Sequence, residues 1–230
     1  MLKSYLKTAW RNFIRNKLLS FINLIGLSVG IAAVLLIGIY FQNEFSYDNF
    51  HKNKESLYRV GFEFLNTGKS LGKSPVFTPP FGPDAQREFP EIQSFCRISE
   101  HHEVFITKGE NKIKSSNICF ADSTFFRLFS FKLHSGNPAN VLKQPYSIVL
   151  TKALAEKLFG NEDAVGKSVR LDGKDDYMVT GVADAAPDNS QISYEALISF
   201  STLYKDTAKY AMDWNGGNQY ITYLNLNNPA

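Results

Sequence analysis

Three short patterns in the sequence resemble sites of chemistry, and each lacks the surroundings that its chemistry requires. Residues 160–168, GNEDAVGKS, resemble a phosphate-binding loop, but five residues separate the two glycines where that loop has four. The sequence on either side of this segment predicts a helix before it and a strand after it. A phosphate-binding loop needs the reverse order, because its amides lie at a helix N-terminus. Residues 160–168 are therefore not expected to bind ATP.

The second pattern, Gly26-x-Ser28-x-Gly30, matches the nucleophile elbow of hydrolases. That elbow requires a strand–turn–helix bend and a general base, whereas Ser28 lies inside a long apolar segment. Gly26 and Gly30 are instead small residues one helical turn apart, which let a second helix approach closely. We interpret the pair as a candidate helix-packing site, although unrelated membrane anchors carry similar pairs.

The third pattern is a set of histidines. His101 and His102 are adjacent, so on a strand they point to opposite faces. His51 and His134 have no cysteine or carboxylate at ligand-like spacing. Acidic residues are scattered singly or in turns. The sequence therefore predicts no catalytic residue, no metal site and no cofactor, and the protein is not expected to be an enzyme.

The segment that organises the chain is residues 18–41, which contains no charged residue. As a helix it would span about 36 Å, enough to cross a hydrocarbon core of about 30 Å. Each charge inside would oppose insertion by about 2.5–3.5 kcal/mol, so the absence of charge is informative. We predict a transmembrane helix. A cleaved signal peptide is the main alternative, but the run is too long and lacks a small-x-small cleavage site.

The charges on the two sides of this segment differ in sign. The first 17 residues contain five bases and no acid, and the first charge after residue 41 is Glu44. The positive-inside rule places the N-terminus in the cytoplasm and residues 42–230 outside. Four of the bases recur every four residues, opposite mostly apolar positions that include Trp10, which is typical of a helix lying in the membrane interface. A solvated basic tail is the alternative. The predicted membrane-interface residues are Lys3, Lys7, Arg11, Arg15 and Lys17.

The composition limits the function of the remaining residues. They contain 20 basic and 22 acidic residues, and the mean hydropathy of the chain is −0.20. A near-neutral, water-soluble region of this length fits one domain and argues against nucleic-acid binding. Cys96 and Cys119 could form a disulfide in an oxidising compartment, but buried free thiols are the commoner outcome.

Short strands mixed with short helices, without regular alternation, predict an α+β domain. Asp122 and Thr151 are predicted helix N-caps, Gly160 is a predicted helix stop, and residues 68–83 are predicted to form a loop. The predicted strands are 57–65, two or three strands within 92–108 and 112–120, 146–150, 168–171, 177–182, 193–200 and 219–226. The predicted helices are 83–88, 126–128, 152–159 and 201–205.

Two stretches resemble a known family. The first is residues 9–18, AWRNFIRNKL, continuing into 23–32, NLIGLSVGIA. The second contains SIVLT at 147–151, AEKLFG at 155–160, AVGK at 164–167 and VTGVAD at 179–184. Together they resemble the N-terminal part of an ABC-transporter permease of the MacB/FtsX-like family, including its extracytoplasmic core domain.

The resemblance implies an inner-membrane permease subunit that does not hydrolyse ATP itself. A cytoplasmic ABC ATPase would move the membrane helices, and that motion would reach the outer domain, which is called mechanotransmission. The implied cargo is peptides, drugs or lipoproteins. Efflux of antimicrobial peptides is one implied activity. The implied partners are that ATPase, a second permease copy in a homo- or heterodimer and membrane lipids, with a periplasmic adaptor as a further candidate.

Two alternatives belong to other functional classes. A signal-anchored extracytoplasmic sensor or binding module would carry a second membrane helix and a cytoplasmic output domain. A membrane-anchored enzyme would need a catalytic constellation. Because residues 227–230 follow directly on the last predicted strand, we expect the sequence to continue in a longer protein that includes further membrane helices.

Overall fold

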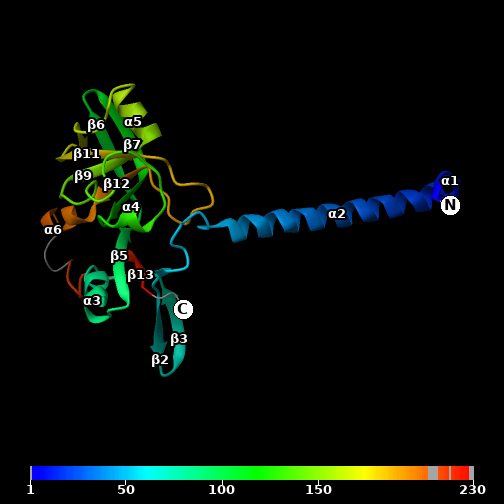
Figure 1. Cartoon of the computed structure of the whole chain (residues 1–230), viewed down its shortest axis with the longest axis horizontal. Coiled ribbons are helices and arrows are strands. Elements are labelled where there is room, and N and C mark those ends of the chain that lie inside the picture. Colours follow the sequence, from blue (N-terminus) through cyan, green and yellow to red (C-terminus); the bar gives the residue numbers. More distant parts are fainter. Residues whose placement is uncertain (1, 207–211, 218, 228–230) are drawn as a thin grey trace. The chain divides into compact units, whose positions relative to one another are not determined.

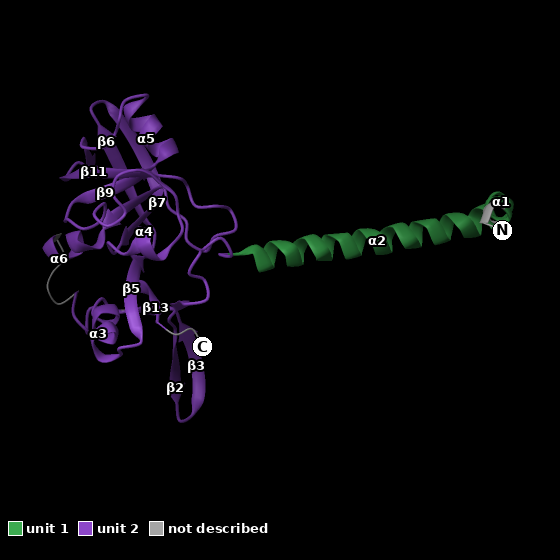
Figure 2. Cartoon of the chain, in the orientation of Figure 1, with its two compact units in different colours: residues 1–47 green, residues 48–230 purple. Residues whose placement is uncertain are grey.

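The computed structural model describes residues 2–206, 212–217 and 219–227, apart from the side chains of residues 2, 3, 6 and 9. The chain divides into two compact units, Met1–Tyr47 and Asp48–Ala230 (Figure 2). The first unit contains α1 (Leu2–Arg15) and α2 (Lys17–Ser46), and the second contains all strands (Figure 1). The α+β class is confirmed.

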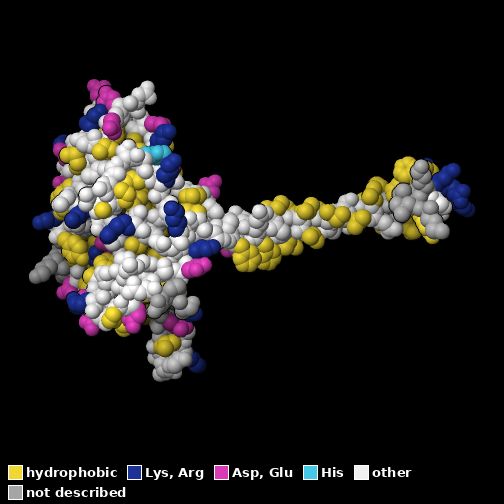
Figure 3. Space-filling view, in the orientation of Figure 1, with side chains coloured by type: hydrophobic (Ala, Val, Ile, Leu, Met, Phe, Trp, Pro, Cys, Tyr) yellow, Lys and Arg dark blue, Asp and Glu magenta, His cyan; other side chains and the backbone are white. Residues whose placement is uncertain are grey.

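The apolar segment of the sequence forms most of α2. No side chain of α2 is buried, and its best window has a mean hydropathy of 2.5. Among the described residues it is the one helix that is long and apolar enough to cross a membrane. Figure 3 shows hydrophobic side chains along α2 on the face in view. The helix continues five residues beyond position 41, into residues that are predicted to lie outside the membrane.

The second unit is organised by strands that close on themselves. β7 pairs with β12, β12 with β9, β9 with β11, β11 with β10, β10 with β6, and β6 returns to β7. The β7–β12 and β9–β11 pairs are parallel and the other four are antiparallel. The ring strands are β6 (His102–Lys108), β7 (Asn111–Ala121), β9 (Ser147–Thr151), β10 (Ser168–Leu171), β11 (Asp175–Ala183) and β12 (Ala196–Ser199).

Further elements extend this ring. β5 (Ile92–Ser99) pairs with β7, β13 (Tyr220–Leu226) pairs with β5, and β1 (Leu57–Arg59) pairs with β13. β4 (Val76–Phe77) also pairs with β13, and β8 (Leu133–Ser135) pairs with β11. β2 (Phe62–Asn66) and β3 (Lys69–Ser74) form a separate two-stranded sheet. The short helices are α3 (Phe81–Glu88), α4 (Phe125–Leu128), α5 (Lys152–Phe159), the 3₁₀ turn η1 (Phe200–Thr202) and α6 (Leu203–Asp206).

Alternation along the ring strands separates two hydrophobic clusters. On β12, Ala196 and Ile198 belong to a cluster that takes side chains from all six ring strands and from α5. Leu197 points the other way, into a cluster with α4 and side chains of β5 and β13. Each fully buried aliphatic or aromatic side chain contributes about 1.5–3 kcal/mol, so both clusters stabilise the unit. The ring interior is therefore a packed core.

Several expectations about local structure are confirmed. Thr151 caps α5, because its hydroxyl accepts a hydrogen bond from the Leu154 amide at 3.4 Å. Gly160 ends α5 with a φ of 64°, a conformation that suits glycine. β10 and β11 match the strands predicted at 168–171 and 177–182 and pair antiparallel, and α3 ends before Pro90, at Glu88 as predicted.

Three expectations are wrong. The strand predicted over 57–65 is interrupted at Val60 and Gly61, so β1 and β2 belong to different sheets. The predicted loop 68–83 contains β3, β4 and the start of α3, because β3 pairs with β2 across a tight turn. Asp122 is not a side-chain cap: Thr124 occupies the N-cap of α4, and Asp122 binds Arg97 instead.

Candidate membrane anchor and junction site

The predicted basic stripe lies on α1 and at the start of α2. Lys7, Arg11, Arg15 and Lys17 are exposed, whereas the side chain of Lys3 lies outside the described set. Trp10 and Phe13 stack with their ring centroids 6.3 Å apart. α1 is therefore a helix that carries both basic and exposed aromatic side chains, as an interfacial helix requires.

Asn16 separates the two helices. Its φ of −112° and ψ of 60° break the helical path between Arg15 and Lys17. The Asn16 amide still donates to the Asn12 carbonyl at 3.0 Å, and the Ser20 amide donates to the Asn16 carbonyl at 2.9 Å. The bend, which we call the elbow, is therefore a local interruption between α1 and α2.

The two candidate motifs of the apolar segment lie within α2. Ser28 is part of a continuous helix, so the strand–turn–helix bend of a nucleophile elbow is absent there. A side chain added at Gly26 or Gly30 would meet open space. Both glycines are thus exposed, and their role in packing another helix stays a prediction.

The second unit begins at Asp48, which forms hydrogen bonds with residues 189–191. Asp48 has a left-handed φ of 55°, and its amide donates to the Asn189 carbonyl at 2.9 Å. Its Oδ1 accepts from the Ser190 hydroxyl at 3.0 Å and from the Gln191 amide at 3.2 Å. Aspartate tolerates this backbone region better than most residues. The bonds fix the entry of the chain into the domain.

Three residues later, His51 reaches into the core. Its ring is 4 % exposed, and its Nδ1 accepts a hydrogen bond from the Ser130 amide at 3.1 Å. The Lys52 amide in turn donates to the Ser130 hydroxyl at 2.8 Å. Because Nδ1 is an acceptor, the proton of the neutral ring lies on Nε2, which is 3.8 Å from the Asp48 carboxylate.

The surroundings of His51 are aromatic. The ring centroids of Phe50, Phe129 and Phe131 lie 4.1, 5.3 and 5.2 Å from that of His51. Burial lowers the pKa of His51, and the charge of Asp48 offsets part of that effect. The ring is therefore held neutral near pH 7. We call Asp48, His51, Ser130, Ser190 and Gln191 the junction clamp.

No role for His51 follows from its local sequence. Its local pattern, Phe50-His51 among polar residues, is a weak sign of burial. Lys52 and Ser130 are 78 positions apart in the sequence, and Asp48 and Gln191 are 143 positions apart. Contacts between residues so far apart have no local signature in the sequence.

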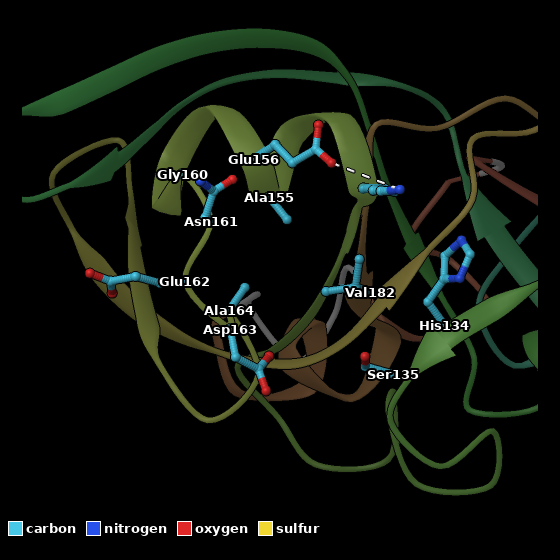
Figure 4. A pocket seen from close by; sticks show the side chains of 11 residues that line it. His134, Ser135, Ala155, Glu156, Gly160, Asn161, Glu162, Asp163, Ala164 and Val182 are labelled. Carbon is cyan, nitrogen blue, oxygen red and sulfur yellow. Dashed lines mark ion pairs between the residues drawn. The ribbon is translucent and has the colours of Figure 1, made fainter.

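A pocket of about 380 Å³ lies beside α5 in the second unit (Figure 4). Lys152 and Glu156 form an ion pair at 4.0 Å, whereas Figure 4 shows Glu156, Glu162 and His134 on separate walls. It is lined by His134, Ser135, Lys152, Ala155, Glu156, Gly160, Asn161, Glu162, Asp163, Ala164 and Val182. Within the described part of the chain, no group of three or more His, Cys, Asp or Glu could hold a metal ion.

The other histidines have separate surroundings. The His134 Nε2 lies 2.5 Å from the Asp184 carboxylate, a partner that sequence spacing did not indicate. This hydrogen bond lowers the pKa of Asp184. His101 lies 3.1 Å from the Ser193 carbonyl, whereas His102 packs against the ring of Phe120. His102 is the first residue of β6, and His101 directly precedes that strand.

The segment 160–168 connects α5 to β10, in the order opposite to that of a phosphate-binding loop. Within it, Lys167 pairs with Glu162. Cys96 and Cys119 are free thiols and both are buried, so they are not paired.

The fold and the helix that precedes it can be compared with known proteins. The family model of the MacB-like periplasmic core domain matches residues 20–229. The chain belongs to this family. The MacB-like periplasmic core domain is part of ABC-transporter permeases, and this membership gives the chain its general role. No curated protein matches the chain.

Three solved structures resemble this MacB-like chain. A domain of a protein assigned as a permease from Porphyromonas gingivalis has a TM-score of 0.64 and 18% identity, over 78% of this chain and 79% of that one. The periplasmic region of MacB from Actinobacillus actinomycetemcomitans has a TM-score of 0.53 and 17% identity, over 76% of both chains. The extracellular domain of the noncanonic ABC-type transporter YknZ from Gram-positive bacteria has a TM-score of 0.53 and 15% identity, over 75% and 84%. At these identities the structures establish the shared fold.

Proposed function

We propose that this chain is the N-terminal part of an ABC-transporter permease subunit in the inner (plasma) membrane of a bacterial cell. The basic segment of residues 1–17, which contains the amphipathic helix α1, lies on the cytoplasmic face, residues 18–41 cross the membrane, and residues 42–230 form the extracytoplasmic core domain. The charge asymmetry around α2 and the family match support this arrangement.

In this proposal a separate cytoplasmic ABC ATPase supplies the energy. Its cycle moves the membrane helices, and the outer domain follows, which is mechanotransmission. A second permease copy completes a homo- or heterodimer, and a periplasmic adaptor is a further candidate partner. The cargo class is peptides, drugs or lipoproteins, with efflux of antimicrobial peptides among the candidate activities.

The junction clamp is the observation that best supports coupling between the membrane helix α2 and the outer domain. α2 ends at Ser46, and only Tyr47 separates it from Asp48, which is bonded to residues 189–191. His51 then extends the connection into the aromatic core. A long flexible linker would absorb a displacement of α2, whereas a residue bonded into a packed core passes it on, because packed cores are not continuously deformable.

The test changes the length of the junction. In the purified complex of the full-length permease with its ATPase, hydrogen exchange of the outer domain is compared with and without ATP and vanadate. Insertion of Gly-Ser-Gly-Ser between Tyr47 and Asp48 should abolish the nucleotide-dependent change while ATP hydrolysis continues. The control is the same insertion between Gly109 and Glu110, in the β6–β7 turn, which should keep the change. An unaltered nucleotide response after the junction insertion would contradict the proposal.

A further inference from the structure

The elbow between α1 and α2 contains an apolar pocket of about 310 Å³. It is lined by Phe13 and Ile14 from the last turn of α1 and by Lys17, Phe21 and Leu24 of α2. The three α2 residues are spaced four and three positions apart, so they share one helix face. The four apolar side chains are 45 to 60% exposed, so an apolar partner is needed to cover them.

The charge around this pocket has a single sign. The first 43 residues contain five bases and no acid. Lys17 is the one charged residue that lines the pocket, and no acidic side chain in the described part of the chain pairs with it. An ammonium group next to hydrocarbon is unfavourable unless an anion compensates it.

We propose that the elbow binds one anionic diacyl phospholipid. An acyl chain lies against Phe13, Ile14, Phe21 and Leu24, and the headgroup phosphate accepts hydrogen bonds from the Lys17 ammonium. The inference rests on the proposed function in one respect, that α2 lies in a membrane. A zwitterionic lipid offers the same chains but adds a cationic amine group to an already basic site. A second apolar helix would cover the pocket without neutralising Lys17.

The chain contains its own reporter for this site. Trp10 stacks on Phe13, a pocket residue, with the ring centroids 6.3 Å apart. Trp214 is the second of the two tryptophans and belongs to the other unit. The variant Trp214→Phe therefore leaves Trp10 as the single tryptophan fluorophore. Trp10 contacts Phe13, which lines the pocket.

The test uses the full chain with Trp214→Phe in phosphatidylcholine vesicles. Phosphatidylglycerol or phosphatidylcholine with brominated acyl chains is added at equal mole fraction, and quenching of Trp10 fluorescence is measured. We expect brominated phosphatidylglycerol to quench with an about five-fold higher relative affinity. Lys17→Gln should remove this preference, whereas Lys7→Gln, which deletes the same charge away from the pocket, should keep it.

A second pair of variants tests the apolar part. Leu24→Phe fills the pocket and should reduce quenching by brominated phosphatidylglycerol, whereas Leu27→Phe, one turn further along α2 and outside the pocket, should not. Equal quenching by both brominated lipids, or equal effects of Lys7→Gln and Lys17→Gln, would overturn the lipid site and leave the membrane anchor in place. Absence of quenching by either lipid would overturn the anchor as well.

Discussion

At the scale of single residues, a buried ion pair holds the junction of β5, α4 and α6. Arg97 is 4 % exposed, and its Nε and Nη2 donate to the two oxygens of Asp122 at 2.8 Å each. Its Nη1 donates to the Pro79 carbonyl at 2.6 Å and to the Tyr204 hydroxyl at 2.9 Å. The guanidinium carbon lies 3.9 Å from the ring centroid of Phe200. Burial alone would lower the pKa of Arg97, but Asp122 raises it overall.

Removal of one partner of this pair should destabilise the fold strongly. Arg97→Met leaves the Asp122 carboxylate buried without its cation, which costs about 3–5 kcal/mol. The measurement is chemical denaturation of the full chain in detergent, followed by near-UV circular dichroism. The matched control is Arg170→Met, because Arg170 makes the same type of pair with Asp176 on the surface. No measurable change is expected there, and a similar loss in both variants would contradict the prediction.

His51 should make stability depend on pH. Its pKa is lowered in the folded protein by burial, so the unfolded chain binds the proton more readily. The contribution of His51 to the free energy of unfolding is complete above the ordinary histidine pKa of about 6.5 and is lost as the pH falls below that value. We expect a lower denaturation midpoint at pH 5 than at pH 7.5. His51→Gln should reduce the difference, because glutamine can still accept from the Ser130 amide but does not titrate.

The control for this prediction is His101, which is exposed and lies 3.1 Å from the Ser193 carbonyl, so His101→Gln should keep most of the pH dependence. An unchanged pH dependence in His51→Gln would contradict the assignment of the effect to the junction clamp.

Asp122 shows what the sequence could not supply at this scale. An aspartate just before a short helix fits an N-cap, and local spacing gave no reason to prefer another role. Its partner, Arg97, is 25 positions earlier, and only the pairing of β5 with β7 brings them together. By contrast, Thr151 was predictable because an N-cap bond joins residues three positions apart.

At the scale of elements, the β2–β3 hairpin is distinct from the rest of the second unit. Within the part of the chain that the structure describes, its strands pair only with each other, across a turn in which Thr67 and Gly68 have φ of 48° and 79°. Phe64, Leu65 and Leu71 are exposed, so the hairpin adds little to either core cluster. Phe62 packs on Phe77 at 5.0 Å and forms its base.

Removal of this hairpin should leave the domain folded. Replacing residues 63–73 with Gly-Gly should change the thermal midpoint by no more than about 3 °C, because surface changes away from packed features stay near 0.5 kcal/mol. Ile106→Ala, at a fully buried position of the ring, is the positive control and should cost about 2–5 kcal/mol. Both are measured by circular dichroism during heating. A large loss in the hairpin variant would mean that the hairpin stabilises the core.

The elements themselves were largely predictable, and their pairing was not. β9 and α5 follow from a compact apolar run and from a cap–stop pattern, both of which are local. β3 was missed because its residues, KSLGKS, have weak strand propensity and prolines follow them closely. The closed ring depends on parallel pairing of β7 with β12, in which Cys119 faces Leu197. No local periodicity contains that information.

At the scale of the whole molecule, the two units differ in how they are stabilised. The second unit has packed clusters of buried apolar side chains. The first has no buried residue in α2, and all its charged side chains before Glu44 are basic. An apolar helix without a protein core needs an apolar solvent, and its flanking charges then decide its orientation. The orientation is open to a direct test.

Labelling of single introduced cysteines measures this orientation. The native thiols are silent, since burial raises the pKa of Cys96 and raises that of Cys119 to about 12. Lys174→Cys, at an exposed turn of the second unit, should react with a membrane-impermeant maleimide in intact spheroplasts. Thr8→Cys, exposed on α1, should react only after lysis. The reverse pattern would invert the topology, and equal labelling of both before lysis would mean that α2 does not cross the membrane. Either result would remove the basis for coupling to a cytoplasmic ATPase through the junction clamp. An inverted topology would place the second unit and its clamp on the cytoplasmic side, and an α2 that does not cross the membrane could not pass a displacement from one side of the bilayer to the other.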